Sequence, residues 1–286
     1  MVRDIELAAD LELAIRAARA AGAVAMRSFG GAHDVVEKAP GQPVTQADLE
    51  ADRVLRETLL GERPGDGWLS EETVDNPDRL RRRRVWIVDP IDGTRSYIAG
   101  RPEFAVSVAL AVEGVAVVGV VYNPAADELY WAVQGGGAWL EAGGAPSRRL
   151  SVTPRDRTGA AVLLASRSEI AAGAFDPFHG GWRIEPVGST AYKMARIAAG
   201  AGDVFLSRGP KSEWDVCAGG LLIEEAGGRA TDLRGRSLRY NRPDPYVHGI
   251  IATNAHLHAT MLDAVEQMPP IQRERTRDPL HPGFGE

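Results

Sequence analysis

Long blocks without proline alternate with short apolar runs along this chain, and the two patterns predict helices and strands respectively. Residues 4–28 are rich in Ala, Leu, Glu and Arg and contain no Pro, which favours one long helix. Two glycines, Gly30 and Gly31, follow and are predicted to end it. A second helix is predicted to begin after Thr45, which has an acid three positions later, and to run to Leu60.

Short apolar runs bounded by Gly, Pro, Asp or Asn predict the strands. These runs lie at residues 34–37, 68–70, 85–88, 104–111, 115–121, 129–133, 138–140, 161–165, 182–186, 204–206 and 249–252. Further helices are predicted over residues 190–199, 215–226 and 254–268. Because strands and helices mix without strict alternation, an α/β (α+β) fold of packed helix and sheet layers is favoured over a barrel. The chain divides into halves at 1–150 and 151–268 and a Pro-rich, charged tail at 269–286, which is predicted to be disordered.

Composition and charge exclude several classes of protein. With 286 residues, of which 44% are hydrophobic and 25% charged, the chain has the composition of a globular protein. A net charge of −6 disfavours nucleic-acid binding, because phosphate contacts need clustered Lys and Arg. No run approaches the roughly 18 apolar residues of a membrane span, and the N-terminus does not resemble a signal peptide. One cysteine, Cys217, forms no intrachain disulfide. A cytoplasmic protein without nucleic-acid or membrane partners is therefore expected.

The strongest chemical signal is the segment from Asp89 to Thr94, which reads Asp-Pro-Ile-Asp-Gly-Thr. The apolar run 85–88 delivers Asp89 at the end of a buried strand, which the following proline is predicted to terminate. Asp92 comes after a turn that can direct both carboxylates to one point. Gly93 allows the backbone to approach a ligand closely, and Thr94 opens a helix whose free N–H groups favour an anion. One short segment thus offers metal ligands and a phosphate cradle together.

Two other interpretations of this segment are less favoured. An Asp-Pro turn with Asp92 and Gly93 at a hairpin tip explains neither the second acid nor Thr94. Phosphatases with an aspartyl nucleophile carry two Asp residues separated by one residue, whereas Asp89 and Asp92 are separated by two. An i, i+2 pair lies on one face of an extended segment and this pair does not, so a covalent phospho-enzyme is not expected.

The acids of the segment imply a counter-cation, because clustered carboxylates raise each other's pKa. Mg²⁺ suits the role, since it takes carboxylates together with substrate phosphate oxygens. Glu71 and Asp215 are further candidate ligands. Glu71 is explained equally well as a solvated loop acid, and Asp215 as a helix N-cap. Asp48 has a similar structural alternative through its spacing from Thr45.

Three separated pieces of the sequence together resemble the inositol monophosphatase superfamily. They are Ser70-Glu71-Glu72, the segment from Asp89 to Thr94, and Trp214-Asp215 followed by Ala218-Gly219. This superfamily contains lithium-sensitive, Mg²⁺-dependent phosphatases, among them inositol monophosphatases and 3′(2′),5′-bisphosphate nucleotidases. The resemblance extends over roughly residues 5–265. It implies a layered α-β-α-β-α sandwich, two or three Mg²⁺ ions, and a homodimer as one expected oligomeric state.

The resemblance also implies a role for each matching residue. The ligands of a first metal are implied to be Glu71, Asp89 and the Ile91 carbonyl. Those of a second metal are implied to be Asp89, Asp92 and Asp215, with Glu71 reaching a weaker third ion. The implied catalytic set is Asp48, Thr94 and Glu71, in which Thr94 and Asp48 orient and deprotonate the attacking water. The backbone N–H groups of Gly93 and Thr94 would hold the phosphate.

The substrate is indicated less sharply. Features of the bisphosphate nucleotidase branch are Lys38, Ser166-Arg167-Ser168, Gly188-Ser189-Thr190 with Lys193, and Lys211 to Asp215. Arg208 and Lys211 stand where inositol monophosphatases usually carry an acid that contacts the inositol hydroxyls. Two cations suit a second phosphate better than a sugar ring, unless both face solvent. Against the nucleotidase, Arg95-Ser96-Tyr97 differs from the Lys-Glu-Phe common in that branch.

We therefore expect a phosphomonoesterase that acts on a small phosphorylated substrate, with the 3′-phosphate of adenosine 3′,5′-bisphosphate favoured. The expected substrate contacts are Gly188, Ser189, Lys193, Arg208 and Lys211. An inositol monophosphatase or a broad sugar phosphatase is the main alternative. A regulatory protein that kept the fold and lost the chemistry is disfavoured, because all the expected acids and Thr94 are present.

Overall fold

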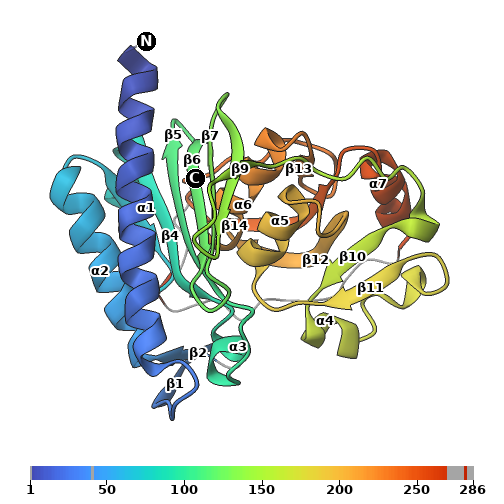
Figure 1. Ribbon diagram of the computed structural model, residues 1–286, viewed down its shortest axis with the longest axis horizontal. Coiled ribbons are helices and arrows are strands. Elements are labelled where there is room, and N and C mark those ends of the chain that lie inside the picture. Colours follow the sequence, from blue (N-terminus) through green and yellow to red (C-terminus); the bar gives the residue numbers. More distant parts are fainter. Residues whose placement is uncertain (1, 40–41, 269–279, 282–286) are drawn as a thin grey trace.

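The computed structural model describes residues 2–39, 42–268 and 280–281. It contains two main sheets, of which the larger has seven strands and is shown in Figure 1. These strands are β3 (Gly67–Ser70), β4 (Arg84–Asp92), β5 (Ala105–Val112), β6 (Val115–Asn123), β7 (Glu128–Val133), β8 (Gly137–Ala142) and β9 (Arg148–Arg149). They lie in sequence order, and only the β3–β4 pair is parallel. Between β5 and β6, Glu113 and Gly114 both adopt positive φ, as a two-residue hairpin turn requires, whereas a longer connection that contains a short helix joins β4 to β5.

The smaller sheet has five strands, all from the second half of the chain. They are β10 (Val162–Ala165), β11 (Arg183–Pro186), β12 (Val204–Ser212), β13 (Arg229–Thr231) and β14 (Tyr246–Thr253). Their order is β11-β10-β12-β14-β13, with parallel pairing around β10 and antiparallel pairing around β14. A separate hairpin of β1 (Val35–Ala39) and β2 (Gln42–Thr45) leads directly into the second helix.

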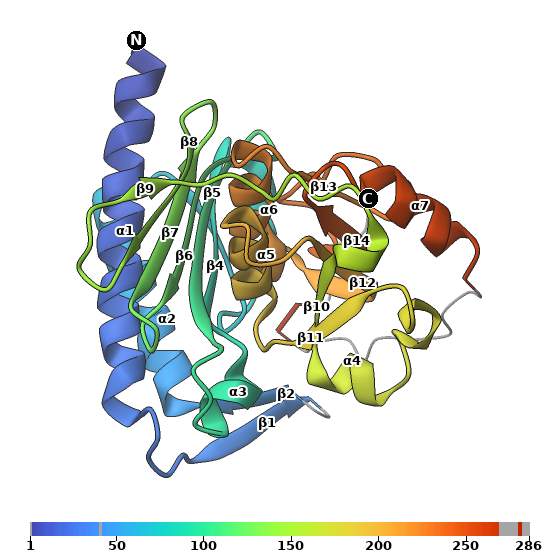
Figure 2. The ribbon, with the colours of Figure 1, turned by 45° about the vertical axis from the view of Figure 1, so that its right-hand side comes forward.

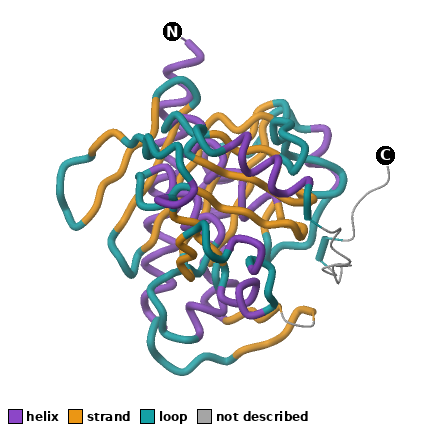
Figure 3. Tube along the Cα trace, turned by 90° about the vertical axis from the view of Figure 1, so that its right-hand side faces the viewer, coloured by secondary structure: helices purple, strands orange, loops and turns teal. Residues whose placement is uncertain are grey.

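Helices lie on both sides of each sheet. They are α1 (Val2–Ser28), α2 (Gln46–Glu62), α3 (Thr94–Ile98), α4 (Arg167–Ala171), α5 (Thr190–Ala198), α6 (Glu213–Glu225) and α7 (His258–Glu266). Short 3₁₀ turns lie at η1 (Pro77–Arg81), η2 (Thr158–Ala160) and η3 (Asp176–Phe178). Figures 1 and 2 show α1 and α2 outside the larger sheet, α5 and α6 between the sheets, and α7 beyond the smaller sheet. The first turns of α1 project beyond the sheets (Figure 3).

Three buried clusters join these layers. Leu13 of α1 and Leu55 of α2 pack with Trp86 on the outer face of the larger sheet. A second cluster fills the space between the sheets around α5 and α6, and a third joins the smaller sheet to α7 and the segment around η3. The predicted α-β-α-β-α sandwich is therefore confirmed.

Strand β4 continues past the point where the sequence predicts its end. The proline at position 90 was expected to terminate it after Asp89, but the strand runs to Asp92. Its pairing with β5 is interrupted between Asp89 and Asp92, and such an irregularity accommodates a residue that lacks an N–H. Both acids therefore remain on one bent strand.

Two other boundaries in the second half differ from the prediction. Strand β12 was predicted to end at residue 206, but it runs to Ser212 through a register shift between Ser207 and Pro210. Helix α7 begins at His258 and not at Asn254, because the Asn254 side chain donates to the Arg155 carbonyl and so fixes the preceding loop. In both places tertiary contacts override the local pattern.

Most of the segment 269–286, for which the sequence predicts disorder, lies outside the described residues. Within it, Leu280 O accepts a hydrogen bond from Asp75 N at 2.9 Å, and His281 is buried. Across the described part of the chain, no helix combines the length and the apolar character needed to cross a membrane.

Candidate metal centre and active site

Three acidic side chains from separate elements converge at one point. Glu71 directly follows β3, Asp89 lies on β4, and Asp215 lies in the first turn of α6. One carboxylate oxygen of each lies within 4.8 Å of the others. Because β3 and β4 are parallel neighbours, their carboxyl ends meet at the same edge of the sheet. The structure thus brings together three of the acids that the sequence proposes as metal ligands.

The cluster fits a divalent cation. Asp89 Oδ1 accepts a hydrogen bond from Ile91 N at 2.9 Å, whereas the buried Oδ2 has no hydrogen-bond partner among the described residues. Burial, followed by the charges of Glu71, Asp92 and Asp215, raises the pKa of Asp89 well above its usual value. A buried carboxylate oxygen beside other acids is costly unless a cation neutralises it. An all-oxygen ligand set of this kind suits Mg²⁺, Ca²⁺ or Mn²⁺.

Asp92 lies at the edge of this cluster and is fastened to the second half of the chain. Its Oδ2 accepts hydrogen bonds from Ser189 Oγ and, at 2.6 Å, from Ala191 N. Burial raises the pKa of Asp92, although these two bonds and the nearby Lys193 oppose the shift. The candidate ligand Asp92 and the candidate substrate residue Ser189 are therefore direct neighbours.

Thr94 and Asp48 are in contact beside the cluster. The Thr94 hydroxyl lies 3.2 Å from Asp48 Oδ1 and 3.1 Å from the Ile91 carbonyl. Asp48 Oδ2 accepts hydrogen bonds from Thr45 N at 2.8 Å and Thr45 Oγ1 at 2.6 Å, which completes the capping box of α2. Burial raises the pKa of Asp48 to about 6 against the opposing effect of the Thr45 bonds. Asp48 therefore completes the capping box of α2 and also contacts Thr94, the residue with which the sequence analysis pairs it.

Gly93 shapes the turn between β4 and α3. Its φ of 96° lies in the left-handed region, which glycine adopts without steric cost. A Cβ at this position would lie 3.1 Å from Glu103 O and 3.2 Å from Ser189 N. Gly93 and Thr94 line the same cavity as Asp92 and Asp215, so the start of α3 lies beside the acids.

Lys38 and Glu72 complete a charged network that the sequence did not predict. Lys38 Nζ lies 3.0 Å from Glu71 Oε1 and 2.8 Å from Glu72 Oε1. Burial opposes the charge on Lys38, but the two glutamates outweigh it and raise its pKa. Burial, followed by the charge of Glu71, raises the pKa of Glu72 to about 8. The adjacent Glu71-Glu72 pair was the one signal in the sequence that could have indicated it.

A cavity of about 600 Å³ opens beside the acids. Four of the proposed substrate contacts, Gly188, Ser189, Lys193 and Lys211, line it. Arg208 instead lines a separate pocket of about 190 Å³. The two spaces share Glu169 and Gly209, but Arg208 is not among the described residues that line the larger one, so it and Lys211 do not line one cavity together.

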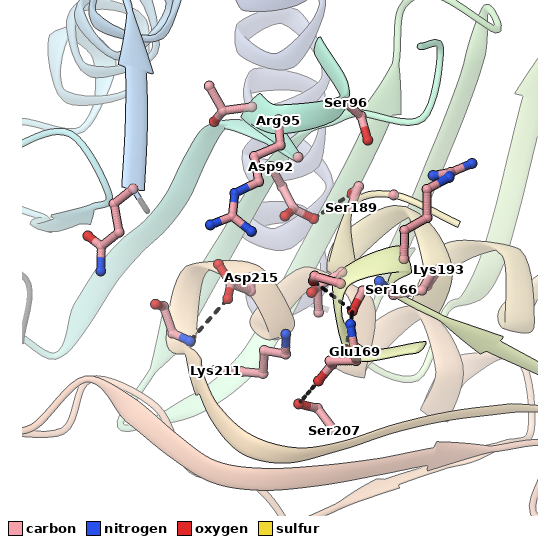
Figure 4. Close-up of a pocket in the computed structure, with 18 of the residues that line it drawn as sticks. Asp92, Arg95, Ser96, Ser166, Glu169, Ser189, Lys193, Ser207, Lys211 and Asp215 are labelled. Carbon is pink, nitrogen blue, oxygen red and sulfur yellow. Dashed lines mark hydrogen bonds between the residues drawn. The ribbon is translucent and has the colours of Figure 1, made fainter. Parts of the chain in front are cut away.

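The wall of this cavity contributed by the second half carries an acid as well as cations (Figure 4). Lys193 is buried, with Nζ 3.3 Å from the Val187 carbonyl. Burial and then Lys211 lower its pKa to about 8. Glu169 accepts a hydrogen bond from Ser207 Oγ at 3.0 Å, and Lys211 and its other partners outweigh burial and lower its pKa. Sequence patterns gave no signal for Glu169, because only the fold brings α4 to this wall.

Comparison with known proteins identifies the family. The family model described as "Inositol monophosphatase family" matches residues 6–269. The chain belongs to the inositol monophosphatase family. It is 37% identical to the inositol-1-monophosphatase of Mesorhizobium japonicum, over 90% of this chain and 96% of that protein. It is 33% identical to the 3′(2′),5′-bisphosphate nucleotidase CysQ of Escherichia coli O157:H7, over 83% of this chain and 96% of that protein.

A solved structure agrees with this membership of the inositol monophosphatase family. The extragenic suppressor protein suhB from Bartonella henselae superimposes with a TM-score of 0.78 and 32% identity, over 91% of this chain and 99% of that one. As a member of this family, the chain is a phosphoric monoester hydrolase. Because the family match ends at residue 269, the described residues Leu280 and His281 lie beyond it.

Proposed function

We propose that this phosphatase depends on Mg²⁺ held by Glu71, Asp89, Asp92 and Asp215. The observation that carries the proposal is the cluster of three acids, in which a buried oxygen of Asp89 has no hydrogen-bond partner among the described residues. Carboxylates that leave room for substrate phosphate oxygens are the ligands that Mg²⁺ takes in such enzymes. When bound, Mg²⁺ supplies a water of lowered pKa and a positive charge beside the leaving oxygen.

The protein's own groups orient the attacking water and accept its proton. The Thr94 hydroxyl donates to Asp48 Oδ1 and so presents its oxygen lone pairs to a water molecule. The water proton passes to Thr94 Oγ1 while the hydroxyl proton passes to Asp48. The two bonds from Thr45 to Asp48 Oδ2 hold the carboxylate in place for this transfer. With a pKa of about 6, Asp48 is mostly ionised at neutral pH and can act as the base.

The proposed substrate is a nucleotide with a second phosphate, adenosine 3′,5′-bisphosphate. Lys193 and Lys211 line the cavity that contains Asp92 and Asp215. The two ammonium groups lie close enough for Lys211 to lower the pKa of Lys193. A dianionic phosphate beside both would relieve this repulsion. The 33% identity to a bisphosphate nucleotidase supports the same choice.

Inositol 1-phosphate is the second candidate. It is favoured by the 37% identity to an inositol-1-monophosphatase. It is also favoured by Glu169, whose ionised carboxylate lines the cavity and can accept hydrogen bonds from the hydroxyls of a polyol.

Phosphate release distinguishes these candidates. We would assay adenosine 3′,5′-bisphosphate, adenosine 3′-monophosphate and inositol 1-phosphate side by side, with Mg²⁺, with EDTA and with added lithium. We expect activity that requires Mg²⁺, is suppressed by lithium, and is highest for the bisphosphate. Equal rates on the two adenosine phosphates would remove any role for a second phosphate. A preference for inositol 1-phosphate would retain the metal site and overturn the nucleotide assignment.

A further inference from the structure

The peptide group that joins Ser70 to Glu71 is held on both sides. Its N–H donates to the Val88 carbonyl at 3.3 Å, which continues the pairing of β3 with β4. Its carbonyl, on Ser70, lies 2.7 Å from His281 Nε2. Because a carbonyl only accepts, His281 donates from Nε2. Strand β3 is an edge strand, so the sheet offers no partner on the side to which this carbonyl points.

The same histidine contacts the element that carries Asp215. Its ring centroid lies 4.4 Å from that of Trp214, the residue immediately before Asp215, with the rings inclined at 46°. The Trp214 carbonyl, which belongs to the peptide group of Asp215, accepts a hydrogen bond from Ser107 Oγ at 3.0 Å. His281 is fully buried at 0% exposure. One side chain therefore touches the residues that directly precede two of the three clustered acids.

The residue before His281 is also tied to the loop that follows Glu71. Leu280 O accepts a hydrogen bond from Asp75 N at 2.9 Å. Asp75 in turn forms a buried ion pair with Arg79 at 2.6 Å. The residue next to the histidine is thus anchored to the segment that follows Glu71. Leu280 and His281 lie beyond the family match, which ends at residue 269, whereas their partners lie within it.

We propose that His281 is a positioning residue of the metal centre, which fixes the Ser70–Glu71 peptide plane and with it the direction of the Glu71 carboxylate. The inference rests on the metal role of the cluster proposed above. Within the described part of the chain, the hydrogen bond of His281 goes to the Ser70 carbonyl and its ring lies against Trp214, so its effect on Glu71 passes through Ser70. Groups behind metal ligands set metal affinity, because they hold the ligands in the binding geometry.

The test measures Mn²⁺ affinity of the full chain from the electron paramagnetic resonance signal of the free ion. His281→Phe keeps a ring against Trp214 but removes the donor, whereas His281→Gln keeps a donor without the ring. His248→Ala, at an exposed histidine, is the matched control. We expect His281→Phe to raise the Kd for Mn²⁺ about tenfold, with His281→Gln and His248→Ala close to the unaltered chain. A chain ending at residue 279, which places no new side chain against Trp214, should show the same loss as His281→Phe.

Activity supplies a second measurement. In His281→Phe, the Mg²⁺ concentration for half-maximal rate should rise by the same factor, while kcat at saturating Mg²⁺ stays within about twofold. Unaltered Mn²⁺ affinity in His281→Phe and in the shortened chain would overturn the inference. The inference would also be overturned if His281→Gln bound Mn²⁺ as weakly as His281→Phe. Ring packing, and not the hydrogen bond, would then set the affinity for Mn²⁺. An unaltered chain that binds no Mn²⁺ would instead refute the proposed metal site itself.

Discussion

In the proposed mechanism the Thr94 hydroxyl has two tasks, because it donates a hydrogen bond to Asp48 and accepts one from the attacking water. Thr94→Val keeps the side-chain shape and removes the hydroxyl. We expect it to lower kcat by about 10²–10⁴-fold, the usual contribution of a positioned proton-transfer group, with Mn²⁺ affinity unchanged. Thr94→Ser should keep most of the activity. A Thr94→Val chain that hydrolyses substrate at the normal rate would remove Thr94 from water activation.

Lys193 should give the reaction a specific pH dependence. Burial and Lys211 lower its pKa to about 8, so it loses its charge as the pH rises through that value. The substrate phosphates remain fully ionised there, since their second pKa is about 6. Binding of the second phosphate should therefore weaken, and kcat/KM for adenosine 3′,5′-bisphosphate should fall between pH 7 and pH 9.

Two comparisons isolate this effect of Lys193. In Lys193→Gln, kcat/KM should be lower at pH 7 and should no longer fall in the same way above pH 8. Adenosine 3′-monophosphate, which lacks the second phosphate, should show a shallower profile with the unaltered chain. Identical profiles for both substrates would indicate that Lys193 does not contact the second phosphate.

The residues of the site differ in how far sequence could predict them. Asp89, Asp92 and Thr94 lie in one short segment, so their spacing along the chain already indicates a shared site. Glu169 and Lys38 reach the site only because α4 and β1 are folded beside it. No local pattern marks Glu169, and only the family resemblance marks Lys38, because the partners of both are distant in sequence.

Helices and strands show how one local signal serves two purposes. Helices α2 and α6 both begin with a capping box, in which the third helical residue is Asp48 or Asp215. This spacing is visible in the sequence as a helix start. The structural and chemical interpretations therefore do not exclude each other, because each acid completes a capping box and also borders the site. The N-cap of α6 is Ser212, however, and not Asp215 as the sequence alternative had it.

The approach of α6 to the larger sheet depends on a glycine of β6. A Cβ on Gly119 would lie 2.9 Å from the Ala218 carbonyl oxygen and 3.1 Å from Ala218 Cα. We expect Gly119→Ala to lower the free energy of unfolding by about 1–3 kcal/mol, as overpacking usually does, and to weaken Mn²⁺ binding, because α6 carries Asp215. Gly61→Ala in α2 is the matched control, since a Cβ on Gly61 would meet no described atom within 4 Å and φ is not positive there.

Urea titrations should show the opposite change in the free energy of unfolding for the control variant, Gly61→Ala. Gly61→Ala restricts the unfolded chain without a clash, so it should raise the free energy of unfolding by about 0.4–1 kcal/mol. Equal effects of the two alanines would show that β6 and α6 are not in close contact.

Strands β4 and β12 both extend beyond their predicted ends. Strands β4 and β12 each pass through a proline at a register shift and continue beyond it. The prediction for β4 treated proline as a terminator because it lacks an N–H, whereas the prediction for β12 ended at residue 206, before its proline. The sequence alone does not show that a neighbouring strand pairs on both sides of a register shift, because this pairing depends on the whole sheet.

The two halves of the chain, divided at residue 150, share part of their hydrophobic core. Helix α6 comes from the second half, yet it packs against the larger sheet of the first half. Trp214 and Cys217 share one buried cluster with Ile87 and Val121. A common core of this kind should unfold as one unit.

The buried ion pair of Arg79 and Asp75 offers a test of whether the two halves unfold as one unit. Arg79 bonds both carboxylate oxygens of Asp75, at 2.6 and 2.8 Å, and reaches the second half through Asn241 Oδ1 at 2.8 Å and the Arg242 carbonyl at 2.9 Å. Arg79→Met leaves Asp75 buried without its cation, so the free energy of unfolding in urea should fall by about 3–5 kcal/mol. Arg83→Ala breaks only an exposed pair and should change it by less than about 1 kcal/mol.

The number of urea transitions shows whether the two halves of the chain unfold together. If the two halves share one core, Arg79→Met should move a single transition to lower urea, seen at the same midpoint by tryptophan fluorescence and by circular dichroism. Loss of the pair would then weaken both sheets together, because Arg79 joins the segment after Glu71 to the residues that bond Glu213, the first residue of α6. Two separate transitions, with only one of them sensitive to Arg79, would show that the halves are independent folding units after all.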